Sequence, residues 1–356
     1  MITTHPTIRV NRVKHSRLPE VDFNNLPFGR VFSDHLLLIE YANGDWKQPQ
    51  IMPYGNLNLS PATSALHYGQ SIFEGMKAHR DINSNDIILF RPEKNAERFN
   101  RSAVRMGMPE LPTDLFMESL IELVKLDRRW VPNRSDSALY LRPFMFGTDP
   151  YIGVHSSETF QFIIFTCPVG PYYSRPISVL ADDYFVRAFK GGTGEAKAAG
   201  NYGATLYPAK LAKQRGYDQI LWMDGQERKY VDEIGTMNVF FIIDGVAVTP
   251  MLDGTILEGV TRESVIQLFR DKGIPVEERQ VSIDELVAAT KNNTLQDAFG
   301  AGTAATITHI SGFGYKGQHY ELPEPASRSL SIAIKTELEG IKRGSVADRH
   351  GWTMRI

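Results

Sequence analysis

A single lysine stands among glycines and alanines in the stretch from Gly191 to Tyr202, which reads GGTGEAKAAGNY. Within four positions of Lys197 the only charged neighbour is Glu195. Small side chains let a flat ligand lie against the backbone, and a lysine amine attacks carbonyl groups once burial lowers its pKa toward neutrality. Lys197 is therefore a candidate covalent anchor. Taken alone, however, the segment fits a solvated loop lysine better.

Acid and hydroxyl groups follow downstream of this lysine. A hairpin pattern over residues 226–250 places Glu233 and Thr236 ahead of an apolar strand. Two turns that run from glycine to threonine come later, LEGVT ending at Thr261 and FGAGT ending at Thr303. One lysine, one carboxylate and two threonine-bearing turns form a constellation that favours a binding site over a solvated loop.

Six short segments carry a resemblance to a known family. They are FEGMKA from Phe73, YLRP from Tyr140, KAAGNYGATLYP from Lys197, EIGTMN from Glu233, EGVTR from Glu258 and GAGTA from Gly300. In this order they resemble the class IV aminotransferases, which are pyridoxal 5′-phosphate enzymes of fold type IV, and within them the branched-chain aminotransferases. The match spans residues 60 to 310, most of the chain.

The resemblance implies roles for the residues nearest the cofactor ring. Lys197 matches the lysine that binds the cofactor aldehyde and then moves the substrate proton. Glu233, 36 positions later, matches the glutamate facing the pyridine nitrogen, where a carboxylate favours the protonated ring. Tyr202 matches the phenol that hydrogen-bonds the cofactor O3′, although it could equally pack on the helix that it precedes. Lys190 is the competing lysine.

The cofactor phosphate needs several donors. Val260 and Thr261 lie where EG turns into a helix, so free N–H groups and the helix dipole can hold a dianion there; an ordinary helix start would look the same. By resemblance, Thr303 is a second hydroxyl donor, Thr236 also belongs to the cofactor site, and Arg98 is the phosphate arginine. Physics alone does not separate Arg98 from other basic residues of its helix.

Substrate recognition requires a carboxylate clamp and an apolar pocket. Tyr140 and Arg142 are spaced i, i+2, which places both on one face of a strand; in the family this pair helps to receive substrate carboxylates. The resemblance assigns the α-carboxylate to the backbone amides of Thr303 and Ala304. It assigns the pocket to four aromatic residues, one of them from a second subunit: Phe73, Tyr172, Tyr202 and, across the homodimer, Tyr68. Each aromatic taken alone is more often core than pocket.

Several elements must position these groups. Pro92, a favoured first-turn residue, predicts a helix with Ala96, Phe99 and Ala103 on its apolar stripe, ending at Gly107. Further helices are expected from residue 113, over 203–215 and over 261–272, and after Ser282, which has capping-box spacing to Glu285. Strand patterns alternate with helix patterns in the first half.

The fold class predicted from these patterns is α/β, mixed α+β in character. Three prolines and a glycine in the segment 167–178 indicate a boundary. We expect a small N-terminal α/β domain (residues 1–172), a connection (173–184) and a larger C-terminal domain (185–356) that carries the cofactor lysine. By resemblance the larger domain has a mixed, barrel-like sheet.

Composition excludes some classes of partner. The 41 acidic and 39 basic residues give a net charge of −2, so no strong field attracts a nucleic acid or an anionic membrane. Apolar runs are of strand length, too short for a membrane span. The single cysteine, Cys167, excludes an intrachain disulfide and favours a cytoplasmic protein. The nine histidines contain no H-E-x-x-H motif, so no metal site is expected.

We therefore expect a transaminase that moves the amino group of leucine, isoleucine or valine to 2-oxoglutarate, giving 2-oxo acids and glutamate. A D-amino-acid transaminase, an aminodeoxychorismate lyase and a noncatalytic protein of the same fold remain the alternatives. A dinucleotide site at Gly300, Gly302 and Ala305 is disfavoured, because the β-branched residues that follow do not suit the helix that such a turn must open.

Overall fold

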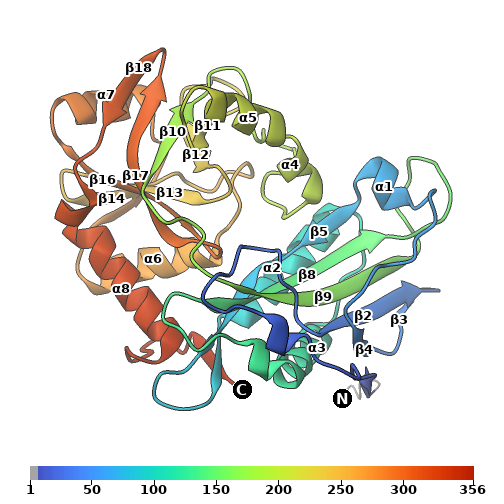
Figure 1. Ribbon diagram of the computed structural model, residues 1–356. Helices are drawn as coiled ribbons and strands as arrows, with labels where there is room; N and C mark the ends of the chain where they lie inside the picture. Colours follow the sequence, from blue (N-terminus) through green and yellow to red (C-terminus); the bar gives the residue numbers. More distant parts are fainter. Residues whose placement is uncertain (1–6) are drawn as a thin grey trace. The chain divides into compact units, whose positions relative to one another are not determined.

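The computed structural model describes residues 7–356, which belong to two compact units. Unit 1 runs to Tyr172 and also contains Ala196–Ala199 and Gly340–Ile356, whereas unit 2 contains Tyr173–Glu195 and Gly200–Glu339. Each unit is built on its own β-sheet (Figure 1). Compactness does not show which parts fold independently, so the domain boundaries expected from the sequence remain a prediction.

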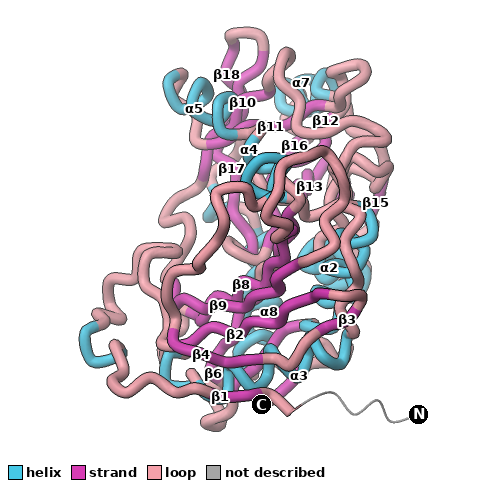
Figure 2. Tube along the Cα trace, turned by 90° about the vertical axis from the view of Figure 1, so that its right-hand side faces the viewer, coloured by secondary structure: helices cyan, strands magenta, loops and turns pink. Residues whose placement is uncertain are grey.

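The sheet of unit 1 is almost entirely antiparallel; only its edge pair β1–β4 is parallel. Figure 2 shows strands β8, β9, β2 and β4 side by side. The spatial order is β1 (Arg9–Val10), β4 (Gln50–Pro53), β2 (His35–Ala42), β9 (Phe160–Val169), β8 (Ala138–Gly147), β6 (Met76–Arg80), β7 (Ile87–Phe90) and β19 (Thr353–Arg355), with β3 (Asp45–Trp46) on β2 and β5 (Ser71–Phe73) on β8.

Helices α2 (Pro92–Arg105) and α3 (Thr113–Leu126) pack on this sheet, and the unit also contains α1 (Ser64–Tyr68), η1 (Leu18–Glu20) and η2 (Arg128–Trp130). The predicted stripe of α2 is buried, with Phe99 in contact with Phe116 of α3 and Phe162 of β9. Arg91, in the left-handed region at φ 48°, turns the chain into Pro92 at the first helical position. The core of unit 1 therefore lies between these helices and the sheet.

The sheet of unit 2 is mixed, since β10 is parallel to both neighbours and β14 is parallel to β15 while the other pairs are antiparallel. Its order is β12 (Val231–Ile234), β11 (Gln219–Met223), β10 (Ile177–Ala181), β17 (Thr306–Tyr315), β16 (Leu295–Gly302), β13 (Asn238–Ile243), β14 (Val246–Thr249) and β15 (Val276–Glu278), with β18 (Gln318–Glu321) on β17. The predicted α/β class, with a mixed sheet in the C-terminal half, is confirmed.

The remaining helices are α5 (Leu206–Gln214), α6 (Val260–Asp271), α7 (Ile283–Lys291) and η3 (Pro325–Ser327), while α4 (Ala199–Gly203) and α8 (Ser329–Arg343) contain residues of both units. Phe269 of α6 packs on the stacked rings of Phe240 and Phe299 in the sheet. The helix predicted over 203–215 begins only at Leu206, because a separate short turn of helix, α4, precedes it.

Two local expectations are confirmed and one alternative is removed. The hairpin turn between β13 and β14 has both central residues, Asp244 and Gly245, at positive φ, as a tight two-residue turn requires. Ser282 caps α7 by accepting from the Glu285 N–H at 3.0 Å. The residues after the GAGTA turn form strand β17 and open no helix, so a dinucleotide-binding turn is wrong for this segment.

Candidate active site

Lys197 is fixed to unit 1 through its backbone. Its N–H donates to Ser102 Oγ on α2 at 2.9 Å, and its carbonyl accepts from the Phe73 N–H at the end of β5 at 3.1 Å. The next residue, Ala198, pairs with Ile72 in an antiparallel bridge. The segment Ala196–Ala199 therefore adds to the edge of the unit 1 sheet, and the side chain of the candidate lysine is only partly buried.

The amine of Lys197 lies against an aromatic ring that also contacts an arginine. Its Nζ is 4.8 Å from the centre of the Phe73 ring, and the Arg142 guanidinium carbon is 4.7 Å from the same centre. Arg142 Nη2 donates to the Tyr140 hydroxyl at 3.0 Å, as expected of two residues on one face of β8. A cation–π contact of this kind is modestly favourable.

Arg142 is a cation without a carboxylate partner. No acidic side chain among residues 7–356 forms an ion pair with it, and its buried Nε has no hydrogen-bond acceptor there. Buried guanidinium groups are normally paired. The Arg142 site therefore has the chemistry to bind a carboxylate brought by a ligand, with the Tyr140 hydroxyl beside it.

Aromatic residues extend this group within unit 1. Phe28 contacts the rings of both Tyr140 and Tyr172 edge-on, at 5.2 and 4.8 Å between ring centres. Burial raises the pKa of the Tyr172 phenol, with a further contribution from Tyr140, so Tyr172 is a neutral hydrogen-bonding group at any physiological pH. Cys167, on the neighbouring strand, has its thiol pKa raised to about 11 by burial.

Arg98 points to a partner that the sequence did not suggest. Its Nε donates to Glu74 Oε1 at 2.7 Å and its Nη2 to Glu74 Oε2 at 2.8 Å, and both side chains are almost fully buried. Glu74 directly follows Phe73 in the FEGMKA segment. The candidate phosphate arginine is therefore already neutralised on two of its nitrogens by a carboxylate of unit 1.

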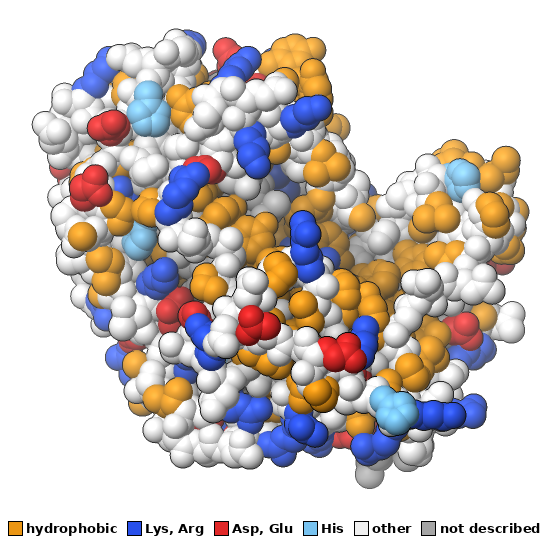
Figure 3. All heavy atoms as spheres, viewed as in Figure 1, with side chains coloured by type: hydrophobic (Ala, Val, Ile, Leu, Met, Phe, Trp, Pro, Cys, Tyr) orange, Lys and Arg blue, Asp and Glu red, His pale blue; other side chains and the backbone are white. Residues whose placement is uncertain are grey.

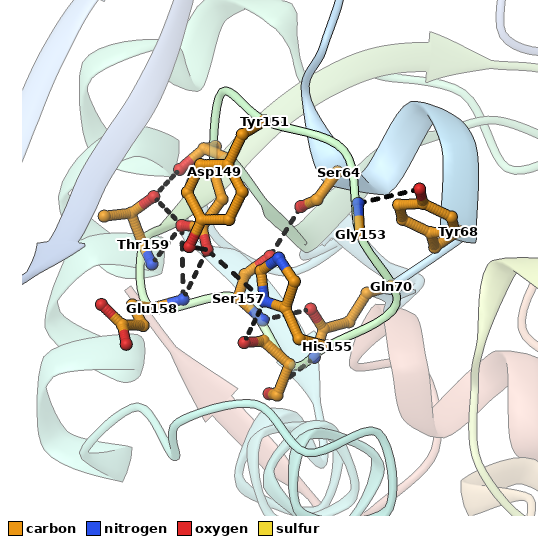
Figure 4. A network of polar contacts seen from close by, with 12 residues as sticks. Ser64, Tyr68, Gln70, Asp149, Tyr151, Gly153, His155, Ser157, Glu158 and Thr159 are labelled. Atoms are coloured by element: carbon orange, nitrogen blue, oxygen red, sulfur yellow. Dashed lines mark hydrogen bonds and ion pairs between the residues drawn. The ribbon is translucent and has the colours of Figure 1, made fainter.

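Tyr68 lies at the end of α1, where its hydroxyl accepts from the Gly153 N–H at 2.9 Å (Figure 4). Its contacts are thus with the loop at residues 148–159. Asp149 holds that loop by accepting from the Glu158 and Thr159 N–H groups, the Thr159 hydroxyl and the Tyr151 hydroxyl.

Within unit 2, Glu233 is a buried carboxylate surrounded by donors. Oε1 accepts from the Leu257 N–H at 2.9 Å and from Asn238 Nδ2 at 3.3 Å, and Oε2 lies 3.3 Å from Arg187 Nε. Asn238 Nδ2 also donates to the Leu257 carbonyl. Donors and a neighbouring cation favour the ionised form of a carboxylate, so Glu233 is suited to face a positively charged group.

The EGVT turn is tied to the same carboxylate through Asn238. Helix α6 begins at Val260, and Gly259 packs so closely on Asn238 that a Cβ there would lie 2.0 Å from its Oδ1. Thr261 is buried in the first turn of α6. The N–H groups of a first helical turn have no acceptor within their own helix, so this end of α6 has the chemistry of the expected anion site, which stays a prediction.

The EIGTMN and GAGTA turns are also neighbours in unit 2. Met237 packs against Gly300 and Gly302, where an added Cβ would lie 2.8 and 3.2 Å from its side chain. Thr303 and Ala304 follow β16 in the turn to β17, and exposed Thr236 lies in the turn beside Gly235. Unit 2 therefore brings Glu233, Thr261 and the EIGTMN and GAGTA turns into one region of its own fold. Tyr202 lies on α4.

A family model described as "Amino-transferase class IV" matches residues 71–312. The chain belongs to the class IV aminotransferases. The matched range contains Lys197, Arg142 and Glu233.

This aminotransferase is similar over nearly its whole length to proteins of known name. It is 42% identical over 99% of its length to Branched-chain-amino-acid aminotransferase 2 of Bacillus subtilis, of which it covers 98%. A branched-chain-amino-acid aminotransferase of Mycolicibacterium smegmatis is 41% identical, with 93% of this chain and 92% of the relative covered. The fold is also similar to that of a solved structure. The crystal structure of the branched-chain amino acid aminotransferase of Escherichia coli matches this chain with a TM-score of 0.72 at 25% identity, and the match covers 90% of this chain and 98% of that one.

Sequence reasoning missed two charged residues of this aminotransferase. Arg187, ten positions before Lys197, forms the ion pair with Glu233, and its Nη2 donates to the carbonyls of Thr255 and Gly194. Glu74 neutralises Arg98. Both lie in otherwise apolar segments, which was the signal available, because a charge inside such a segment is buried only with a partner.

Residues 7–356 offer neither a metal cluster nor a membrane-spanning helix. No cluster of three or more His, Cys, Asp or Glu side chains in this part of the chain could hold a metal ion. None of the helices described there is long and apolar enough to cross a bilayer.

Proposed function

We propose that this aminotransferase transfers the amino group of L-leucine, L-isoleucine or L-valine to 2-oxoglutarate, giving the branched-chain 2-oxo acid and glutamate. One structural observation carries the proposal. Lys197 presents its amine at the ring of Phe73, and the same ring contacts Arg142, a cation that lacks a carboxylate partner among the described residues. An amine and a carboxylate receptor on one aromatic ring suit glutamate and 2-oxoglutarate, whose second carboxylate Arg142 can receive. Named relatives of 40–43% identity support the branched-chain substrates.

The proposed cofactor is pyridoxal 5′-phosphate, which supplies an aldehyde and an electron-withdrawing ring when bound. The residues present fit such a group. Lys197 offers the amine, Glu233 a carboxylate for the ring nitrogen, and the first turn of α6 at Val260 and Thr261 an end for the phosphate. A branched-chain aminotransferase of similar structure was solved with pyridoxamine 5′-phosphate.

Other residues complete the proposed cofactor site by resemblance. Tyr202 is proposed for the cofactor O3′, and Thr236 and Thr303 for additional hydroxyl contacts. Arg98 is the weakest member of the set, because the Glu74 carboxylate already occupies two of its nitrogens.

In the proposed reaction, different side chains of this protein move the proton, pair with the ring nitrogen and bind the substrate carboxylate. With the cofactor bound, the Lys197 amine would be the base that moves a proton between the substrate Cα and the cofactor C4′. The Glu233 carboxylate, with Arg187 beside it, would favour the protonated form of the pyridine nitrogen of a bound cofactor. Arg142, with the Tyr140 hydroxyl beside it, would receive the distal carboxylate of glutamate or 2-oxoglutarate.

The apolar part of the substrate needs a pocket, which we assign to Phe73, Tyr172 and Tyr202. The backbone amides of Thr303 and Ala304 are proposed for the α-carboxylate. Tyr68, whose hydroxyl is bound to the loop at 148–159, is proposed to complete the pocket of a second copy.

A homodimer is therefore part of the proposal. Five exposed apolar side chains, here called the apolar loop cluster, lie on α1 and the adjoining loop: Leu66, Tyr68, Tyr151, Ile152 and Val154. The loop is held by Asp149 and by the Ser64–Ser157 hydroxyl pair (Figure 4). A fixed loop that exposes apolar side chains is typical of a protein interface. A buried thiol at Cys167 suits the reducing cytoplasm, which we propose as the compartment.

The test is a half-reaction. With L-leucine alone the protein should release one equivalent of 2-oxo acid per chain, and added 2-oxoglutarate should restore the starting state. Lys197→Ala should lower the rate about 1,000-fold or more. Lys190→Ala is the matched control, because this lysine is exposed and its ion pair, with Asp253 at 3.4 Å, lies outside the groups assigned to the reaction.

Borohydride reduction followed by peptide mapping identifies the reacting amine. Cofactor on Lys197 supports the proposal, whereas cofactor on any other lysine refutes the assignment. Turnover of D-leucine without L-leucine would point to a D-amino-acid transaminase instead.

A further inference from the structure

Both peptide groups that flank the Cα of Lys197 are held from outside their own segment. Ser102 Oγ accepts the Lys197 N–H at 2.9 Å, and the Phe73 N–H donates to the Lys197 carbonyl at 3.1 Å. The backbone of a residue has only two soft dihedral angles. Fixing the peptide planes on either side therefore fixes the direction in which the lysine side chain leaves the backbone.

The two residues that hold Lys197 are joined to each other. Ser102 lies four positions after Arg98 on α2, so the two side chains share one face of the helix. Arg98 forms the two-pronged ion pair with Glu74, the residue next to Phe73. These contacts, together with the turn of α2 between Arg98 and Ser102 and the peptide bond between Phe73 and Glu74, close a ring that returns to Lys197.

Three members of this ring are buried. Ser102 is 1% exposed, Arg98 5% and Glu74 0%. A hydrogen bond in such surroundings is not exchanged for one to solvent, and a buried N–H that loses its acceptor bears the full cost. The residues on either side of the lysine, Ala196 and Ala198, are also buried and small, which lets the segment approach α2.

We propose that Ser102 is a positioning residue for Lys197, acting through the lysine's backbone N–H. The Arg98–Glu74 ion pair links the helix that carries Ser102 to the residue next to Phe73. The first role of this ion pair is therefore to support the lysine segment. What the amine does rests on the proposed function, whereas the holding of the segment does not. A misplacement of a reacting group by 1 Å is enough to lower a rate about 100-fold.

The test compares Ser102→Ala with Ser119→Ala in the full-length protein. Ser119 is equally buried, on α3 of the same unit, and its Oγ has no hydrogen-bond partner among the described residues. The two variants therefore lose the same atom, but only the first loses a contact. Ser102→Thr keeps the hydroxyl and is the conservative rescue, and Ser102→Cys, a weaker acceptor of similar size, replaces the alanine variant if that protein does not accumulate.

The first readout is amide hydrogen exchange of the peptide that contains Lys197, with and without added pyridoxal phosphate. Ser102→Ala should exchange about tenfold faster at this amide, the equivalent of ~1.4 kcal/mol. Ser119→Ala and Ser102→Thr should match the wild type. Equal exchange in Ser102→Ala and Ser119→Ala would refute the proposal.

The second readout separates positioning from general destabilisation. In Ser102→Ala the kcat with leucine and the rate of borohydride-trapped cofactor on Lys197 should fall about tenfold, while the KM for leucine changes less than twofold. If leucine is turned over and Ser102→Ala behaves as Ser119→Ala, the positioning role is wrong. If no variant or wild type turns leucine over but the Lys197 amide still exchanges faster in Ser102→Ala, the function is wrong and the positioning stands.

Discussion

Two consecutive carboxylates, Asp232 and Glu233, are buried on β12, yet their surroundings differ. A register shift between β11 and β12 leaves Asp232 as the extra residue of a bulge, while Glu233 pairs with Trp222. Glu233 has three polar partners, whereas Asp232 Oδ2 has no hydrogen-bond partner within residues 7–356. Burial raises the pKa of Asp232 to about 7, against the opposing effect of Arg187. Below about pH 7, Asp232 is therefore mostly the neutral acid.

The raised pKa of Asp232 predicts a pH-dependent penalty on stability. The unfolded chain loses this proton near the ordinary pKa of 3.8, and the folded chain keeps it to about 7. The penalty grows between these values and approaches roughly 4 kcal/mol at higher pH. Asp232→Asn should therefore be more stable than the wild type at pH 8 and nearly equal to it at pH 4, as measured by urea unfolding at one-unit intervals.

Asp224 supplies the control of opposite sign. Although burial opposes it, four backbone N–H donors lower the pKa of Asp224. This group stabilises the fold above the ordinary range, and the contribution is lost as the pH falls. Asp224→Asn should thus be less stable than the wild type at pH 8. A gap between Asp232→Asn and the wild type that stays constant from pH 4 to pH 8 would show that ionisation of Asp232 is not its cause.

At the scale of elements, the features that sequence patterns predicted are those specified by neighbouring residues. Pro92 starts α2, Ser282 and Glu285 cap α7, and the hairpin turn at Asp244 lies between β13 and β14. Each of these signals acts within four residues, so the element can be predicted without knowledge of the rest of the fold. The six family motifs extended this reach to the residues of the candidate site.

Pairings distant in sequence could not be predicted in this way. Arg187 meets Glu233 from 46 positions away, and Ser102 meets Lys197 across 95 positions. Nothing local distinguishes Ser102 from other helical serines, because its partner is a backbone N–H that any residue type would offer. The membership of Ala196–Ala199 in unit 1 depends on the same pairing and was equally invisible.

The loop at 148–159 gives a prediction about an element that has no regular structure. Burial favours the neutral acid at Asp149, but hydrogen bonds led by that of the Thr159 hydroxyl outweigh it and lower the pKa of Asp149. Asp149→Asn removes the charge from these bonds and should cost about 1.5–3 kcal/mol at pH 7. Limited proteolysis should then cut the loop at Tyr151 faster, and the gap from wild type should close as the pH falls below the ordinary aspartate range.

Asp136→Asn is the appropriate comparison for that experiment. Asp136 also lies in a loop of unit 1, but its carboxylate pairs with the exposed side chain of Arg134. Surface pairs of this kind contribute little, so the variant should leave proteolysis unchanged. Equal cleavage of the two variants would indicate that Asp149 does not anchor the loop.

At the scale of the whole molecule, the surface charge does not indicate a binding partner, whereas the exposed apolar side chains suit the proposed contact with a second copy. Basic and acidic side chains are interspersed over the face drawn in Figure 3, in keeping with a net charge of −2. No patch of one sign there would steer a polyanion. The apolar loop cluster is different, because Val154 is 91% exposed and Ile152 69% on a loop that internal hydrogen bonds hold in place.

The apolar loop cluster therefore gives a test of the proposed dimer. Replacing both Ile152 and Val154 by Glu would force two charges into the proposed interface, where unpaired charges cost several kcal/mol. The dimer dissociation constant should rise at least 100-fold in sedimentation velocity. Ile82→Glu, which alters an apolar side chain of unit 1 that is 61% exposed outside the cluster, should leave assembly intact. A wild type that stays monomeric at micromolar concentration, or a double variant that dimerises as Ile82→Glu does, would rule out this surface as the contact.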